Sequence, residues 1–293
     1  MSLFMSLQGS VNTIFPFHAL GLPGPGKRAL LARLSALTGR INRFFRTNRR
    51  ICKVICGIKI FLTLIVITLT MPLMPLNAQT YKINKYGLRL INDMASYQQR
   101  ISQDPDLALI PLDSLIEDLK TDFVYATLNN FTGKVLYKAP RAYLRKPAAL
   151  ALQKIARQFN KLGYGLLIYD SYRPYSVTEK MWEVVPDNRY AADPRHGSGH
   201  NRALSVDLSL YDLKTGKPVQ MPTEFDNFTN KAHQGYQNLP DNVLKNRALL
   251  KSVMVHGGFK PLSTEWWHFS YPGDNSRYHL LNLSFAELNN APH

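Results

Sequence analysis

The chain has 293 residues, of which 45% are hydrophobic and 11% aromatic, a composition ordinary for a globular protein. Its net charge of +16 points to a nucleic-acid partner, but ten of its Lys and Arg residues lie in residues 1–80, which contain no Asp or Glu. The remainder carries about +6, an excess common among soluble domains, so we predict no nucleic-acid partner.

The basic N-terminal part runs into an almost wholly apolar stretch, Ile58 to Leu76, which a small residue, Ala78, follows. A basic flank, an apolar run and a small-residue exit are the three parts of a secretory signal. The run before Pro72 is shorter than the roughly 20 residues of a membrane span. We therefore predict that residues 1–78 are a basic leader and export signal, cleaved after Ala78 or retained as an inner-membrane anchor.

The same segment decides the predicted compartment. The protein is expected in the periplasm or outside the cell, with membrane contact only through an uncleaved leader. The stretch before the apolar run is unusually long, so it is either an extended leader or the result of a start placed too far upstream. Both cysteines, Cys52 and Cys56, lie in this leader. The predicted domain, residues 79–293, therefore has neither a disulfide nor a thiol nucleophile.

Several elements are predicted in chain order along this domain. The residue types favour a strand over 123–127, a helix over 147–162 that starts at a proline and ends at a glycine, a buried strand over 165–170 and a helix over 177–185. A long polar loop over 186–199 then leads to His200, and a loop of that length is typical of a functional site.

The second half of the domain begins with an alternating segment, 204–210, which predicts a half-buried strand with Asp207 on its polar face. A helix is predicted over 241–256 with Asp241 as its N-cap, followed by an aromatic strand over 265–269 and an irregular tail after Pro272. Strands and helices alternate without a regular βαβ repeat. This favours an α+β fold: a single domain with a small, mostly antiparallel sheet flanked by helices.

Two short segments carry the residues with catalytic chemistry. His200 and Asp207 lie seven residues apart, and Glu265 and His268 lie three apart some sixty residues later. Two His and one carboxylate form a usual catalytic zinc set, which leaves one position open for water. A second carboxylate beside them can take the proton of that water. An acid within an apolar strand also needs a partner, and a metal is one. The pattern predicts a zinc hydrolase.

Four stretches make a more specific resemblance: residues 125–133, residues 163–174 ending in Ser-Tyr-Arg-Pro, residues 198–226, and residues 258–268 ending in Glu-Trp-Trp-His. In order and spacing they resemble the zinc D-alanyl-D-alanine dipeptidases of the vancomycin-resistance (VanX) type. That group belongs to the D-Ala-D-Ala metallopeptidases, which also include D,D-carboxypeptidases and share a zinc fold with hedgehog signalling domains. The resemblance implies that same fold here.

The resemblance also implies roles for individual residues. His200, Asp207 and His268 would bind one Zn²⁺ per chain. Glu265 would act as the general base that activates the metal-bound water and passes its proton to the leaving amine. Arg173 would face the developing oxyanion.

Four further positions match residues around the family's site. Asp226, Ser198 and Tyr125 would surround the substrate, with Asp226 placed to hold its free ammonium group. Asp170, three residues before Arg173, would orient that guanidinium.

The segment around His200 departs from the family pattern at two positions. The family reads Ser-x-His-x-x-Gly-x-Ala-x-Asp, whereas Ala203 stands here at the Gly and Ser205 at the Ala. An alanine at a glycine position costs little unless the backbone there needs a positive φ. The predicted ligands are intact, so we interpret the change as a shift in the shape of the site.

The predicted function is hydrolysis of the D-alanyl-D-alanine dipeptide to two D-alanines in cell-wall peptide metabolism. An exported enzyme would meet dipeptide released from the wall. Two alternatives stay open: a D,D-carboxypeptidase that trims longer muropeptides, and a non-catalytic zinc domain that binds cell-wall peptide. Glu265 and Arg173 favour an enzyme, since a purely structural site needs neither.

Overall fold

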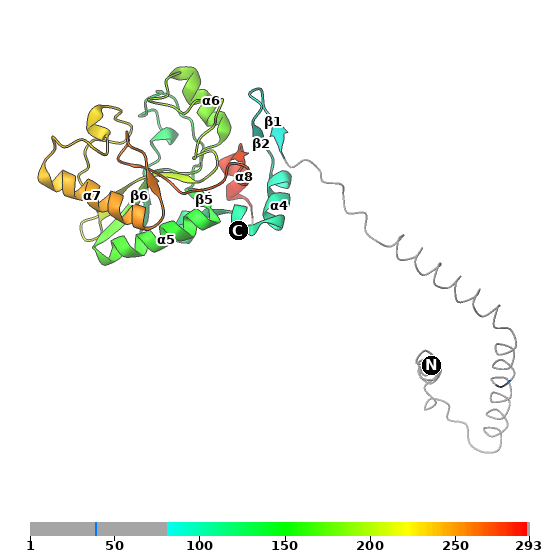
Figure 1. Cartoon of the computed structure of the whole chain (residues 1–293), viewed down its shortest axis with the longest axis horizontal. Coiled ribbons are helices and arrows are strands. Elements are labelled where there is room, and N and C mark those ends of the chain that lie inside the picture. Colours follow the sequence, from blue (N-terminus) through cyan, green and yellow to red (C-terminus); the bar gives the residue numbers. More distant parts are fainter. Residues whose placement is uncertain (1–38, 40–80, 292–293) are drawn as a thin grey trace, which may run out of the picture. The chain divides into compact units, whose positions relative to one another are not determined.

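A five-stranded sheet forms the centre of the computed structural model, which describes Gly39 and residues 81–291 (Figure 1). Its strand order is β4-β6-β7-β9-β8. The strands are β4 (Leu119–Thr121), β6 (Tyr164–Asp170), β7 (Ser205–Asp212), β9 (His268–Ser270) and β8 (Lys260–Pro261). Only β4 and β6 pair in parallel within this sheet, and the other pairs are antiparallel. The predicted mostly antiparallel sheet is therefore confirmed.

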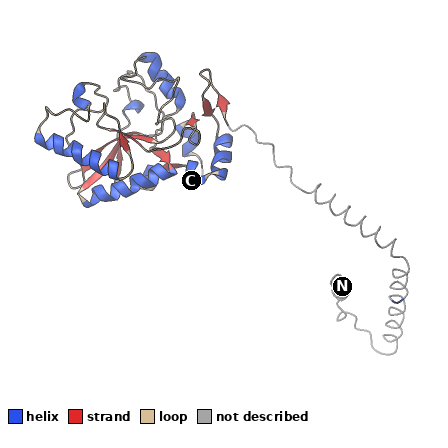
Figure 2. Ribbon diagram, viewed as in Figure 1, coloured by secondary structure: helices blue, strands red, loops and turns tan. Residues whose placement is uncertain are grey.

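Two long helices, α5 (Lys146–Lys161) and α7 (Asp241–His256), cover one side of this sheet (Figures 1 and 2). The apolar residues of α5 recur at helical spacing, and Leu152, Ile155 and Phe159 are fully buried in the core between helix and sheet. Both predicted helices are confirmed to within one residue at each end. Asp241 is not the N-cap of α7, because the helix begins at that residue and Pro240 precedes it as the cap.

The helix α6 (Tyr175–Val184) and most of the N- and C-terminal elements pack around a second core cluster. These terminal elements are β1 (Lys82–Ile83), β2 (Arg89–Ile91), α4 (Met94–Gln103), β10 (Leu280–Leu281) and α8 (Phe285–Asn289). The prediction of an irregular tail after Pro272 is wrong. Leu281 pairs with β2, and Phe285 and Leu288 enter the second core cluster, because the tail closes an apolar surface that distant segments provide.

Short elements complete the described part of the chain. They are the strand pair β3 (Leu109–Pro111) and β5 (Tyr143–Arg145), and the 3-10 turns η1 (Pro105–Leu107), η2 (Leu112–Ser114), η3 (Val124–Ala126) and η4 (Asn230–Ala232). The predicted strand over 123–127 is wrong, since η3 occupies it. The carbonyl of Tyr125 in that turn accepts hydrogen bonds from the amides of Leu136 and Tyr137, which fold the following loop back on it.

The strand β7 differs from the half-buried strand that its alternation predicts. Its apolar face packs in the core, as expected, but Ser205, Asp207 and Ser209 on the other face are each at most 3% exposed. The polar face is covered by the segment before the strand and by neighbouring strands. Polar side chains on a covered face need hydrogen-bond partners or ligands, so this face of β7 is where a site is expected.

The described elements form an α+β domain, so the predicted fold class is confirmed. The predicted leader over 1–78 lies almost wholly outside the described residues, and both the leader and its cleavage stay predictions. Within residues 81–291, no helix has the length and apolar character needed to cross a membrane.

Ala203 holds a backbone conformation that alanine adopts rarely. Its φ is +56°, in the left-handed region, and its side chain is fully buried. The backbone at this position therefore has the positive φ at which alanine is unfavourable compared with glycine. Left-handed backbone costs an L-residue about 1–2 kcal/mol. The segment retains this strain immediately before β7.

We expect Ala203→Gly to change the free energy of unfolding by less than about 1 kcal/mol. Relief of the left-handed strain offsets the lost methyl burial of about 0.8 kcal/mol and the entropy of glycine, roughly 0.5–1 kcal/mol. The matched control is Ala156→Gly, buried in the middle of α5, which should lose about 2 kcal/mol. Urea unfolding of both variants measures the difference, and equal losses would contradict the strain.

Candidate active site

The register of the central sheet brings three residues with catalytic chemistry side by side. Asp170, at the end of β6, pairs with Asp207 of β7, and Asp207 pairs with His268 of β9. Directly opposed residues on paired strands have Cβ atoms about 4.5–5.5 Å apart. The register shifts between Ile168 and Asp170, and such irregularities redirect side chains beside functional sites. Side chains almost a hundred residues apart in sequence therefore lie within contact distance.

His200 reaches the same place from the loop before β7. The amide of Arg173 donates to the His200 carbonyl at 3.1 Å, and the Asn201 side chain donates to the Arg173 carbonyl at 3.0 Å. The His200 ring is fixed by a contact of 2.7 Å between its Nδ1 and the Ser171 carbonyl. Because a carbonyl can only accept, Nδ1 carries the proton of the neutral ring. The lone pair of Nε2 then faces Asp207 and His268.

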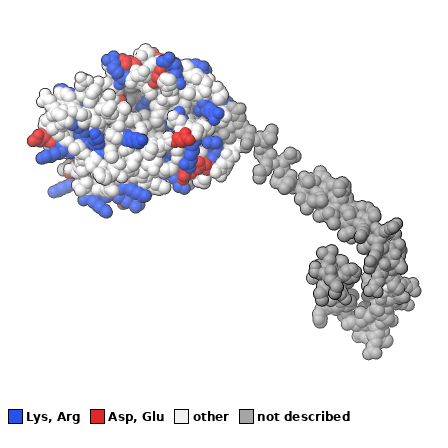
Figure 3. Space-filling model, in the orientation of Figure 1, with Lys and Arg blue, Asp and Glu red and all other residues white. Residues whose placement is uncertain are grey.

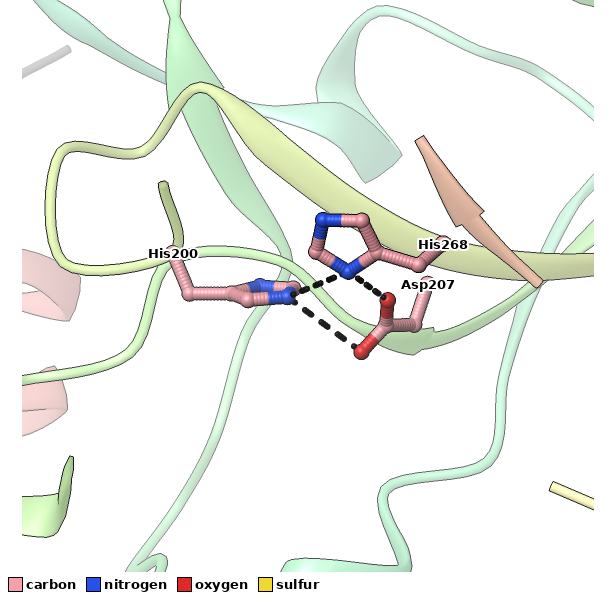
Figure 4. A group of neighbouring side chains, drawn as sticks. All are labelled: His200, Asp207 and His268. Atoms are coloured by element: carbon pink, nitrogen blue, oxygen red, sulfur yellow. Dashed lines mark hydrogen bonds and ion pairs between the residues drawn. The ribbon is translucent and has the colours of Figure 1, made fainter. Parts of the chain in front are cut away.

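The three side chains form a compact group with one potential ligand atom each (Figure 4). His200 Nε2 lies 3.3 Å from Asp207 Oδ2 and 3.3 Å from His268 Nδ1, and His268 Nδ1 lies 2.9 Å from Asp207 Oδ1. Tetrahedral zinc with bonds of about 2.0–2.1 Å separates its ligand atoms by roughly 3.3 Å. Two His nitrogens and one carboxylate are also the donors that such an ion takes, so these residues fit a metal ion.

Electrostatics in the group favour an ionised carboxylate. Burial opposes the charge of Asp207, but the two neighbouring imidazoles hold its pKa well below the usual range. Burial likewise opposes a charged His200, but the charge and hydrogen bond of Asp207 together with the charge of Asp170 raise the pKa of that ring. A metal cation placed between these side chains would stabilise the negative charge of Asp207 in place of the protonated imidazoles. Ligands of this kind release their protons on metal binding.

A second carboxylate stands beside the group. Glu265, in the loop between β8 and β9, places Oε2 3.9 Å from His268 Nδ1. Burial, together with the negative charge of Asp207, raises the pKa of Glu265 to about 7. The next two residues, Trp266 and Trp267, are buried at 1% exposure and anchor the loop in the core. A carboxyl group with a pKa near neutrality is suited to accept and release a proton.

Arg173 is held in a fixed position by Asp170. Its Nη2 and Nε lie 2.6 and 2.9 Å from Asp170 Oδ2. The other oxygen of Asp170 accepts from the Tyr137 hydroxyl and from the Ser171 amide, each at 2.8 Å. Although burial opposes the charge of Arg173, Asp170 raises the pKa of the guanidinium. A buried cation with a satisfied counter-ion can be directed at a substrate at little further cost.

Tyr125 and Asp226 form a second pair on the same side. The Tyr125 hydroxyl donates to Asp226 Oδ2 at 2.8 Å, and the Arg173 guanidinium lies 5.4 Å from the centre of the Tyr125 ring. Burial raises the pKa of Asp226 to about 7. The backbone of Asp226 has a φ of +60°, a second left-handed residue at this site. Strained backbone of this kind clusters at functional sites.

Among the predicted site residues, Ser198 has neither a hydrogen bond nor an ion pair to the others within the described chain. Its amide donates to the Asn201 side chain at 3.0 Å, and its hydroxyl accepts from the Asn201 amide at 3.2 Å. These bonds close the turn that carries His200. Its role toward the substrate, like the individual roles of the other site residues, stays a prediction.

Sequence reasoning missed two residues that the structure adds. Tyr137 binds Asp170 from a loop 33 residues away, and nothing in its surroundings signals this. Ser270 Oγ lies 3.1 Å from His268 Nε2 and 2.7 Å from Ser205 Oγ. The strand predicted over 265–269 lies instead at 268–270, and Ser270 follows His268 by two residues on the same face, so strand periodicity continued by one residue could have found it. A Cβ at Gly199 would collide with the Ser205 hydroxyl, so the glycine leaves room for this pair.

The fold and the site together define an α+β protein with the donor set of a metallohydrolase. The model of the Peptidase M15 family, described as D-Ala-D-Ala dipeptidase, matches residues 106–288, and the chain belongs to this family. The predictions of this family and of a dipeptidase are confirmed.

Several characterised proteins are similar to the chain. The D-alanyl-D-alanine dipeptidase of Escherichia coli K12 is 37% identical over 178 residues, which cover 61% of this chain and 91% of that protein. The proteins of the same name from Enterococcus faecalis and Streptomyces coelicolor are 32% and 34% identical over 54% of this chain and 88% and 89% of their own lengths. A solved structure of the LdcB LD-carboxypeptidase is 19% identical, covers 69% of this chain and 89% of that one, and has a TM-score of 0.31.

We expect Ser270→Ala to weaken metal binding about tenfold or more. The Ser270 hydroxyl oxygen lies at hydrogen-bond distance from His268 Nε2. Removing such a partner from a ligand histidine typically lowers metal affinity 10–100-fold. Ser205→Ala should have a smaller effect because its hydroxyl hydrogen-bonds to Ser270 and not to His268. Competition titration with Zn²⁺ measures both, with Ser252→Ala on the exposed face of α7 as control. An unchanged affinity for Ser270→Ala would show that His268 needs no such support.

Proposed function

We propose that this chain hydrolyses the D-alanyl-D-alanine dipeptide with Zn²⁺ held by His200, Asp207 and His268 and with Glu265 as general base. The observation that carries the proposal is the close group of two His and one Asp with a second carboxyl group, of pKa about 7, beside it. Family membership supports the substrate, since the matching family and the similar proteins carry the name of that activity.

Zinc held by His200, Asp207 and His268 would lower the pKa of a water molecule and polarise the peptide carbonyl. Glu265 accepts the proton of the attacking water and then delivers it to the nitrogen of the leaving D-alanine. A group that must do both works best when its pKa is near the working pH. The burial that raises the pKa of Glu265 is therefore part of the proposed mechanism.

Arg173 is proposed to stabilise the negative charge that develops on the carbonyl oxygen. Asp170 holds the guanidinium through Nε and Nη2, so Nη1 is the nitrogen that this carboxylate does not hold. The ring of Tyr125 lies against the same guanidinium. A donor fixed before the reaction needs no reorganisation as the charge forms, which is why such groups lower barriers effectively.

Asp226 is proposed to bind the free ammonium group of the dipeptide. Its carboxyl is buried, and it accepts a hydrogen bond from Tyr125. A cationic ammonium beside it would restore the charged form, because an opposite charge lowers the pKa of a carboxyl. A carboxylate that closes the amino side of the site favours a dipeptide over a longer chain.

The proposed mechanism is tested by measuring D-alanine release from D-Ala-D-Ala with the purified full chain. Wild-type protein loaded with Zn²⁺ should release D-alanine, and a chelator should stop it. Glu265→Gln should lower kcat by about 10²–10⁴-fold, the usual contribution of a general base. Competition titration should show that this variant still binds Zn²⁺, because Glu265 is not a ligand. Turnover by Glu265→Gln at the wild-type rate would refute the mechanism.

Asp226→Asn tests the assignment of the substrate's amino end. Asparagine tolerates the left-handed backbone of this position and retains a hydrogen-bond acceptor for Tyr125, so the change removes mainly the charge. We expect kcat/KM for the dipeptide to fall roughly 10–100-fold, the value of a charge-assisted hydrogen bond. The exposed Asp274→Asn is the control.

The same variant separates the dipeptidase from the D,D-carboxypeptidase alternative. A pentapeptide ending in D-Ala-D-Ala has no ammonium at this point, so its hydrolysis should be slow and little affected by Asp226→Asn. Equal losses on dipeptide and pentapeptide would remove Asp226 from the amino-end role. Faster wild-type hydrolysis of the pentapeptide would favour the carboxypeptidase.

A further inference from the structure

A hollow lies at the end of the domain formed by the first and last described elements. Its volume is about 210 Å³, and its wall includes Arg89 of β2, Arg202 of the loop before β7, and His279 just before β10. Gly87, Leu88, Asn275, Ser276 and Leu280 complete the lining. None of these residues belongs to the proposed catalytic group, and Arg89 precedes the segment that matches the family.

The imidazole of His279 is buried without hydrogen-bond partners. The residue is 5% exposed, and neither Nδ1 nor Nε2 has a partner within the described part of the chain. The ring makes an edge contact with Tyr81 at 5.3 Å, which satisfies neither nitrogen. A neutral imidazole has one donor and one acceptor, and native proteins rarely leave both unpaired. The ring is therefore an unpaired, buried polar group in the wall of the hollow.

The surroundings of His279 are strongly positive. Burial lowers the pKa of His279 to about 4, and Arg100, Arg89, Arg145 and Arg202 all act in the same direction. Arg145 is 1% exposed, and its hydrogen bonds go to the carbonyls of Leu107, Arg202 and His279. Buried guanidinium groups are normally paired with a carboxylate. Here four arginines from four segments converge on one uncharged ring.

The nearby carboxylates are engaged elsewhere. Asp104 and Asp106 bind Arg277, whose Nε and Nη2 lie 2.7 and 3.1 Å from their respective oxygens. Residues 1–80 contain no Asp or Glu side chain, so none of them can supply a carboxylate from that part of the chain. On the face of the domain drawn in Figure 3, Lys and Arg are widespread while Asp and Glu form small groups. The hollow therefore keeps a concentration of positive charge that an anion would neutralise.

We propose that this hollow binds a phosphoryl group, with Arg89 and Arg202 holding its oxygens and the buried His279 ring lying in the wall beside it. The planar fork of arginine matches phosphate oxygens and forms short, charge-assisted bonds with them. A water molecule occupies about 30 Å³, so the hollow has room for a phosphate and part of the group that carries it. The phosphoryl group belongs either to a soluble phosphate ester or to a lipid headgroup.

The first experiment titrates inorganic phosphate into the full chain after the metal has been removed by chelation and dialysis. Without metal, the proposed catalytic group has no ion for phosphate to bind. Nuclear magnetic resonance of labelled histidine follows the ring, with His279→Gln identifying its signals. Phosphate should raise the pKa of His279 from about 4 by one to three pH units, because a neighbouring anion favours the charged ring.

Matched variants locate the binding. Arg89→Gln should weaken phosphate binding about tenfold or more, as measured by calorimetry, because it removes a charged donor to the phosphate oxygens. Arg89 is exposed and its side chain contacts the Tyr81 ring, so the substitution should not disturb the core. Arg157→Gln, an exposed arginine on α5, should leave it unchanged. Both variants should keep wild-type release of D-alanine when zinc is restored.

A comparison of sources completes the test. Glycerol phosphate is titrated in solution, and vesicles containing phosphatidylglycerol or only phosphatidylcholine are used for co-sedimentation. Glycerol phosphate binding that depends on Arg89 identifies a soluble ester, and an Arg89-dependent preference for phosphatidylglycerol vesicles identifies a headgroup. Binding unaffected by Arg89→Gln, or no binding to phosphate, glycerol phosphate and vesicles alike, would overturn the proposal. These binding outcomes do not depend on whether the chain cleaves D-Ala-D-Ala.

Discussion

The pairing of β6, β7 and β9 is the constraint on which the site depends. The strand pairing aligns Asp170, Asp207 and His268 across three strands, and two positions further along β7 and β9 it aligns Ser205 with Ser270. A slip of one residue would turn Asp207 toward the apolar core and face Val206 to the site. The apolar face of β7 fixes the register, so the energy that buries Val206 and Leu208 also places the ligands.

The carboxyl groups of the site differ in pKa because their surroundings differ. Two imidazoles lower the pKa of Asp207, whereas burial raises those of Glu265 and Asp226 to about 7. Asp170 completes the set by neutralising Arg173. Pairs of titratable groups whose environments separate their pKa values usually mark distinct chemical roles. The different burial and charge around these carboxyl groups match the separate roles proposed for them.

Two left-handed residues, Ala203 and Asp226, lie in the segments that complete the site. At Ala203 the turn after His200 returns to the sheet, with the amides of Ala203 and Leu204 bonded to the carbonyls of His200 and Gly199. The strain is tolerated because this turn is also fixed to the Ser171–Arg173 segment on the opposite side. Alanine at this position thus leaves the geometry of the candidate metal site intact, and the cost of its left-handed backbone falls on the turn.

The sequence by itself determined the α+β class, the main helices and strands, the metal-ligating residue types and the family. Those features depend on periodicity and on motif spacing, which local residues carry. Only the tertiary structure decided that the polar face of β7 is buried, that Tyr137 and Ser270 support the site, and that the tail after Pro272 closes the domain. It also gathered four arginines around His279 from four separate segments. Contacts between segments far apart in the chain arise from packing, and no local pattern records them.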